Sequence, residues 1–253
     1  MFDRVRLCAR GLAIAAVLAT GSAATAATLS IDTFSPSSVR EAIARADALY
    51  QAGAPTVREG FESFDAWGTG TGTQNPTTAV GTFTSIGGKG AGRAVIGDAK
   101  KLQVRDDKPM PWNRINLTDR GNNWLDSNDT YGMKWEVGGL PSFNALSFIL
   151  SDVADQGGKF SITIGDKLFS EVLGASGRLV DGGLYVVSIL LPEAVSSLTV
   201  LLHNSTLTDG FGIDAVRVSL DLPTPVPLPP AVLLIVAGMG MIAVVRRRRS
   251  PEA

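Results

Sequence analysis

The chain has 253 residues, of which 45% are hydrophobic and 19% are charged, and this composition predicts a folded protein rather than a disordered one. Residues 27–223 hold 16 basic and 22 acidic residues, because seven arginines lie at the two ends, and so acidic a body argues against a nucleic-acid partner. Cys8 and His203 are the only cysteine and histidine, which excludes a disulfide framework, multi-histidine metal sites and most hydrolases built on these residues.

Residues 1–26 match a secretory signal peptide. Three arginines lie in the first ten positions, an apolar stretch follows over 11–19, and Ala24-Thr25-Ala26 provides the small residues of a cleavage site. The apolar stretch is about half as long as a membrane-spanning helix requires, so cleavage by signal peptidase is favoured over a retained anchor. This pattern predicts export and a mature protein that begins near Ala27.

Residues 27–55 are predicted to form an N-terminal helical segment. Ser38 and Glu41 make a capping box, and apolar residues recur at helical spacing from Val39 to Tyr50. The pattern predicts one helix of about 14 residues, ended by a glycine and a proline. We expect its apolar face to pack on the following domain; binding of a partner is the alternative.

In residues 56–222 the apolar pattern changes to a period of two. Alternation is clearest over 159–164 and 213–218, and short apolar runs occupy 184–191 and 198–202. Gly-Gly and Asp-Gly turn signals separate these segments. About ten short strands without a strong helical pattern between them predict a mainly β protein, an antiparallel, jelly-roll-like β-sandwich.

Asparagine and aspartate gather in the segment 122–129. It offers oxygen ligands at close spacing, but Tyr131 stands where the loop of a calcium hand requires glycine, so that motif is excluded. Two interpretations stay open, a cation- or sugar-binding ridge and an ordinary turn cluster beside a core tryptophan. The candidate ligand-binding residues are Trp124, Asp126, Asn128 and Asp129.

Short acidic motifs open and close the β-rich segment. Phe61-Glu62 and Ile213-Asp214 resemble the opening Phe-Glu and closing Ile-Asp elements of extracellular jelly-roll modules such as MAM and carbohydrate-binding domains, in which such acids often coordinate calcium. If the two end strands pair, Glu62 and Asp214 meet as like charges, which a hard cation such as Ca²⁺ would neutralise. The sequence therefore predicts a calcium site at Glu62 and Asp214, with solvated carboxylates as the alternative.

Residues 223–253 are predicted to form a Pro-rich linker, a short transmembrane helix and an Arg-rich tail. The prolines prevent a helix from extending backward, and the fifteen residues 231–245 carry no charge. At 1.5 Å each, these residues reach about 22 Å, which is shorter than a hydrocarbon core of about 30 Å. The positive-inside rule places the arginines in the cytoplasm and the body outside.

This order of segments resembles the PEP-CTERM class of bacterial sorting signals, particularly the variant that begins Val-Pro-Leu-Pro-Ala, although Pro230 here stands before the alanine. The resemblance implies export in a Gram-negative bacterium, transient insertion in the inner membrane and recognition by an exosortase-type enzyme. Proteins with such tails typically accompany exopolysaccharide and biofilm matrix production; a permanent tail anchor is the alternative. The sorting-motif residues are Val226, Pro227, Leu228, Pro229, Arg246, Arg247, Arg248 and Arg249.

Two functions fit the whole sequence. One is an exported surface or extracellular-matrix protein whose non-catalytic sandwich binds exopolysaccharide or another surface component, with or without calcium. The other is a glycan-active enzyme, which needs paired carboxylates in a cleft. Glu62, Asp65 and Asp214 could supply such a pair, but no acid-base motif is recognisable, so binding is favoured and no catalytic residue is assigned.

Overall fold

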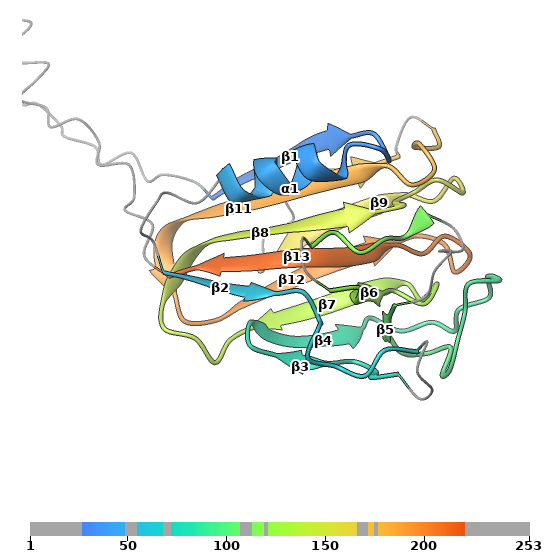
Figure 1. Cartoon of the computed structure of the whole chain (residues 1–253), viewed down its shortest axis with the longest axis horizontal. Helices are drawn as coiled ribbons and strands as arrows, with labels where there is room; N and C mark the ends of the chain where they lie inside the picture. Colours follow the sequence, from blue (N-terminus) through green and yellow to red (C-terminus); the bar gives the residue numbers. More distant parts are fainter. Residues whose placement is uncertain are drawn as a thin grey trace, which may run out of the picture.

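A computed structural model of the chain describes residues 27–48, 55–67, 72–106, 113–118, 121–165, 172–174 and 177–220. These residues form two packed antiparallel sheets and one helix, so the predicted mainly β, antiparallel sandwich is confirmed (Figure 1). The predicted signal peptide and the sorting tail lie outside the described residues. No helix in the described part of the chain is long and apolar enough to cross a membrane.

The first sheet has the strand order β1-β11-β8-β13-β6-β5, and β2 pairs with β13 beside this path. The pairing places Val57 opposite Val218, so the strands that open and close the β-rich segment pair as expected. The strands of this sheet are β1 (Thr28–Phe34), β2 (Thr56–Glu59), β5 (Gln103–Arg105), β6 (Trp124–Asp126), β8 (Phe143–Ser151), β11 (Leu184–Val195) and β13 (Gly212–Ser219).

The second sheet has the order β10-β9-β12-β7-β4-β3. Its strands are β3 (Thr77–Thr78), β4 (Gly81–Ser85), β7 (Gly132–Val137), β9 (Phe160–Ile164), β10 (Val172–Leu173) and β12 (Leu198–Asn204). From β7 onward the chain passes repeatedly between the two sheets. The loops that follow β4, β6, β8, β10 and β12 therefore gather at one end of the sandwich, on the right in Figure 1.

Aromatic side chains from both sheets form the centre of the core. Phe83 and Trp135 stack in the second sheet with ring centroids 5.3 Å apart, and Trp135 meets Phe148 of the first sheet edge-on at 6.0 Å. The indole N–H of Trp135 donates to the carbonyl of Val80, so its polar atom is satisfied within the core. Alternating strands such as β9, which buries Phe160, Ile162 and Ile164, supply the rest of this layer.

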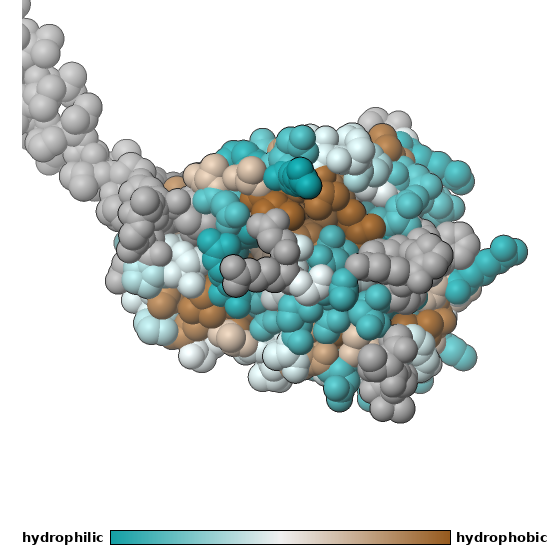
Figure 2. All heavy atoms as spheres, in the orientation of Figure 1, coloured by the Kyte–Doolittle hydropathy of each residue, from teal (hydrophilic) through white to brown (hydrophobic). Residues whose placement is uncertain are grey.

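Helix α1 (Val39–Ala48) packs on the outer face of the first sheet. It buries Ala42, Ile43 and Ala46 in a second apolar cluster with residues of β8 and β11, which confirms the packing predicted for its apolar face. Figure 2 shows hydrophobic residues gathered beside this helix, whereas most of the remaining visible face is hydrophilic. The predicted helix ran on to Tyr50, which lies outside the described residues.

The prediction that residues 27–55 are a helical segment is wrong for their first part. Strand β1 occupies Thr28–Phe34 and pairs with β11, so that Leu29 lies opposite Ile189 and Ile31 opposite Val187. Leu29 and Ile31 alternate with exposed neighbours, a period-two signal too short to stand out. The segment is therefore part of the sandwich and not a separate preface to it.

Candidate functional site

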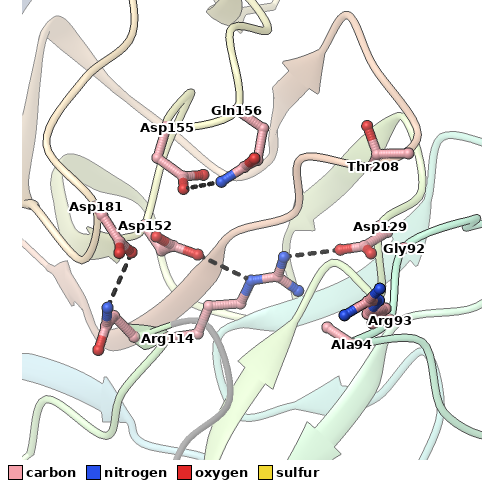
Figure 3. Close-up of a pocket in the computed structure, with 11 residues that line it drawn as sticks. Gly92, Arg93, Ala94, Arg114, Asp129, Asp152, Asp155, Gln156, Asp181 and Thr208 are labelled. Carbon is pink, nitrogen blue, oxygen red and sulfur yellow. Dashed lines mark hydrogen bonds and ion pairs between the residues drawn. The ribbon is translucent and has the colours of Figure 1, made fainter.

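A cleft of about 460 Å³ opens at the end of the sandwich where β4, β6, β8, β10 and β12 finish (Figure 3). Each of the five loops that follow these strands contributes to it, together with the irregular segment 113–118. The lining residues are Gly92, Arg93, Ala94, Asn113, Arg114, Asp129, Asp152, Asp155, Gln156, Asp181 and Thr208. The cleft thus joins residues that are far apart in the sequence.

Arg114 holds the floor of this cleft together. Its side chain is 4% exposed, and its guanidinium donates to Asp129 at 2.7 Å, to Asp126 at 3.0 Å and to Asp152 at 3.4 Å. Burial acts to lower the pKa of Arg114, but the three carboxylates together raise it above its ordinary value. Arg105 also donates to Asp126, at 2.8 Å. The result is a buried ionic network that fixes three loops relative to one another.

Two glycines allow the backbone to approach this network closely. A Cβ at Gly210 would meet Asp129 Oδ1 and would lie 2.6 Å from the guanidinium carbon of Arg114. A Cβ at Gly92 would overlap Asp129 Oδ2. Both positions therefore require glycine because the buried carboxylate occupies the space that a side chain would need.

Three aspartates form an acidic group along one wall of the cleft. Carboxylate oxygens of Asp152, Asp155 and Asp181 all lie within 4.8 Å of one another. Asp152 accepts from the backbone N–H of Gly182 at 3.0 Å, and Asp181 accepts from Asn113 Nδ2 at 2.9 Å. Burial raises the pKa of Asp152 to about 7, against the influence of Arg114 and with a further increase from Asp155 and Asp181.

Asp209 lies beneath the loop that carries Asp155. Its Oδ2 accepts from the backbone N–H groups of Gln156 and Gly158, at 3.2 and 3.0 Å. Its Oδ1 is buried and has no hydrogen-bond partner in the described residues. Burial raises the pKa of Asp209 to about 6, with a smaller increase from the charge of Asp155.

Several loop residues around the cleft adopt left-handed backbone conformations. The φ angles are +56° at Asn113, +53° at Asn128, +55° at Asp129, +62° at Asp152 and +55° at Ala154. Asparagine and aspartate tolerate this region better than other residues with a Cβ, whereas Ala154 adopts it at a cost. Such conformations persist only where surrounding contacts enforce them, as the ionic network does at Asp129 and Asp152.

The structure separates the four candidate ligand-binding residues predicted from the segment 122–129. Trp124 is 1% exposed, with the guanidinium carbon of Arg105 at 5.6 Å from its ring centroid, so it is a core residue and not a ridge for a sugar ring. Asp126 is fully buried between two arginines, and Asn128 donates to backbone carbonyls of a neighbouring loop. Of the four, Asp129 lines the cleft.

The predicted calcium ligands occupy a second region, beside a cleft of about 390 Å³ that Glu62 lines. Asp214 is fully buried, and its two oxygens accept from the backbone N–H groups of Leu117 and Ala215, both at 2.6 Å. Glu62 accepts from the backbone of residues 122 and 123 at 3.1 and 3.0 Å. Burial raises the pKa of Asp214, and the nearby charge of Glu62 adds to this. Calcium between the two carboxylates stays a prediction.

Sequence reasoning missed Arg114 and the three-aspartate group. Asp181-Gly182 and Asp209-Gly210 were recognised as turns, because Asp-Gly is a turn signal, and not as ligands. The signal that could have found them is the recurrence of aspartate in the loops that follow strands. When successive strands alternate between two sheets, every second loop lies at the same end of the sandwich, so these aspartates can meet there. Arg114 lies in an irregular segment, where no periodicity announces a buried charge.

No protein-family model matches the sequence, and no curated protein matches it. Solved structures that match part of the chain include the K2 cleaved adhesin domain of Lys-gingipain, 11% identical with a TM-score of 0.40, over 66% of this chain and 98% of that one. The module CBM27-1 of Caldicellulosiruptor saccharolyticus, solved in complex with mannohexaose, is 15% identical with a TM-score of 0.36, over 66% and 98%. The CBM22-1 xylan-binding domain of Paenibacillus barcinonensis Xyn10C is 11% identical with a TM-score of 0.28, over 60% and 97%. All three TM-scores lie below 0.5, so nothing about this chain is concluded from these structures.

Proposed function

We propose that the protein is an exported, non-catalytic surface or extracellular-matrix protein whose jelly-roll-like sandwich binds polysaccharide in the loop-end cleft. The cleft itself is the observation that supports this most directly. Its volume of about 460 Å³ falls within the range of ligand-binding pockets, roughly 300–1,000 Å³. The buried ionic network around Arg114 holds its walls in place, which lowers the entropic cost of ordering the cleft loops when a ligand binds.

The lining favours a neutral, polyhydroxylated ligand. Gln156 and Thr208 offer both donors and acceptors, and Asp155 and Asp181 offer carboxylate acceptors for sugar hydroxyl groups. Four aspartates line the cleft against two arginines, so its net charge opposes an anionic chain. A polysaccharide without uronate or sulfate groups is therefore the proposed ligand class.

The two ends of the sequence supply the proposal for export and sorting. Signal peptidase removes residues 1–26, and the short transmembrane helix over 231–245 inserts transiently in the inner membrane. An exosortase-type enzyme then recognises the PEP-CTERM-like tail and delivers the sandwich to the cell surface or the matrix. Mass spectrometry of the protein recovered outside the cell reports both termini; an extracellular protein that still begins at Met1 contradicts this route.

Retention of the full chain on immobilised polysaccharides tests the binding function. We expect a neutral β-mannan or xylan to retain the protein and an alginate to retain it poorly. Gln156→Ala and Thr208→Ala remove hydrogen-bonding groups from the exposed cleft wall and should each weaken binding by about tenfold. Glu136→Ala on the outer face of β7 is the matched control. Equal retention of the unmodified protein and all three variants would mean that the cleft does not bind the polysaccharide.

A glycan-active enzyme is the second candidate, and one observation favours it. Carboxylate oxygens of Asp152, Asp155 and Asp181 lie within 4.8 Å of one another, and the pKa of Asp152 is raised to about 7. A retaining glycosidase uses two carboxyl groups about 5–5.5 Å apart, one of them an acid with a raised pKa. Release of reducing ends from a bound polysaccharide, lost in Asp155→Asn, would establish this activity. Binding without release favours the non-catalytic function.

A further inference from the structure

We propose that Tyr131 and His203 form an aromatic platform, outside the cleft, that binds one sugar ring of the polysaccharide held in the cleft. This inference rests on the proposed function and extends its site. The two rings stack with their centroids 6.1 Å apart and their planes inclined by 16°. Tyr131 is 38% exposed, and His203 is also exposed. Such a separation is typical of offset stacking, which leaves part of each ring face uncovered.

Backbone contacts hold Tyr131 in place. Its N–H donates to the carbonyl of Gly87, and its own carbonyl accepts from the N–H of Asn204, both at 2.9 Å. Gly88 has a φ of +83°, and a Cβ there would lie 2.8 Å from Cδ2 of the Tyr131 ring. Glycine at this position therefore lets the backbone pass close to the ring edge. A platform fixed in this way loses little conformational entropy when a ligand binds.

The aromatic platform borders the cleft. Asp129, which lines the cleft, precedes Tyr131 by two residues, so their Cα atoms are at most about 7 Å apart. A Cβ at Gly88 would meet both Tyr131 and Leu207, and Leu207 directly precedes Thr208 of the cleft lining. One oligosaccharide can therefore contact the cleft and the platform together.

The chemistry of the platform favours a sugar ring. A pyranose presents C–H groups on one face, which pack on an aromatic ring, while its hydroxyl groups stay in water or reach polar groups at the ring edge. The phenol of Tyr131 and the imidazole of His203 offer such polar groups. The sequence suggested Trp124 for sugar contact; that side chain is buried, whereas Tyr131 and His203 present their rings to solvent.

The surroundings of the platform argue against a protein partner. Ile86 is its exposed apolar neighbour, 38% exposed. Farther along the outer face of the second sheet, Thr84 lies opposite Lys134 and Thr82 opposite Glu136, so the surface becomes mainly polar. A stable protein interface needs about 800 Å² on each partner, with an apolar centre. A few exposed side chains at a loop end suit a single sugar ring instead.

The experiment uses the full chain without an affinity tag and a neutral mannan or xylan oligosaccharide. His203 is the only histidine, so its ring signals in NMR spectra are identified directly. We expect these signals to shift on titration and to show contacts with sugar C–H protons. In calorimetry, Tyr131→Ala should weaken binding about tenfold, whereas Tyr131→Phe keeps the ring and should stay within about twofold of the unmodified protein.

Two further variants complete the test. Glu136→Ala, at the far end of β7, should bind as the unmodified protein does, and Gln156→Ala reports on the cleft. Weaker binding by Gln156→Ala together with full affinity of Tyr131→Ala, or His203 signals that do not move while cleft amides shift, would overturn the platform and leave the proposed function standing. Absence of any binding by the unmodified protein would overturn the proposed function, and the platform with it.

Discussion

The cleft aspartates and the Glu62–Asp214 pair are both groups of acids near strand ends, but different donors satisfy their oxygens. Backbone N–H groups hold both oxygens of Asp214 and of Glu62. In the cleft, two buried arginines hold Asp126 and Asp129, while Asp155 and Asp181 receive only neutral amide donors among the described residues. Two acids that lie close together can therefore be satisfied by the backbone itself, as Glu62 and Asp214 are.

Removal of Arg114 should cause the largest loss of stability. Arg114→Met keeps the length of the side chain but leaves Asp126, Asp129 and Asp152 buried without their shared cation. Breaking a buried ion pair from one side typically costs about 3–5 kcal/mol in the free energy of unfolding. Chemical denaturation measures it, with Arg93→Met, an exposed arginine of the same cleft, as the control. A loss below about 1 kcal/mol for Arg114→Met would mean that the network does not hold the loops.

Asp214→Asn, in the Glu62–Asp214 pair, should cause a smaller loss of stability. The amide of asparagine has only one oxygen, so it can accept from the backbone N–H of Leu117 or of Ala215, and its NH₂ group faces the other. One buried N–H therefore loses its acceptor, which lowers the free energy of unfolding by about 1–3 kcal/mol. We expect this cost in chelator as well as in calcium. If calcium binds between Glu62 and Asp214, the variant also loses a stabilisation of about 2.7 kcal/mol at a calcium concentration of about one hundred times Kd. Equal stability of variant and unmodified protein in chelator would contradict the backbone-capping account.

Two buried acids at the cleft end, Asp152 and Asp209, should also make the stability of the protein depend on pH. Burial raises the pKa of Asp152 to about 7 and of Asp209 to about 6, whereas the ordinary value is 3.8. The folded protein therefore binds more protons than the unfolded chain between these values, and its stability falls as the pH rises from about 4 to about 7. Urea midpoints in chelator measure this fall. Asp152→Asn should make it shallower; an unchanged slope would contradict the contribution of Asp152.

Much of the fold could be predicted from the sequence because its strongest signals are local. The alternation over 159–164 and 213–218 corresponds to β9 and β13, and α1 begins directly after Ser38, where the capping-box pattern predicts a helix start. Strand β1 was missed because only Leu29 and Ile31 carry its pattern, and pairing with β11, far along the chain, stabilises it. Non-local pairing of this kind overrides weak local preference.

The candidate site was less predictable than the fold. The sequence identified Asp129, which lines the cleft, but it also suggested Trp124, which is buried in the core. The burial of Trp124 depends on packing that no local pattern encodes. The cleft needs five loops that the exchange of strands between sheets brings together, and Arg114 joins them from a segment without periodicity. A single sequence shows which turns contain aspartate, but not which turns meet.

Residue-resolved mapping by NMR decides whether the loop-end cleft binds a neutral polysaccharide, as proposed. Backbone amide NMR spectra of the protein, titrated with a neutral mannan or xylan oligosaccharide, locate the contact surface. We expect saturable shifts concentrated in residues 92–94, 152–156 and 181–183 and at Thr208. Shifts confined to α1 or to the outer face of β7 and β12, with the cleft loops unchanged, would contradict it.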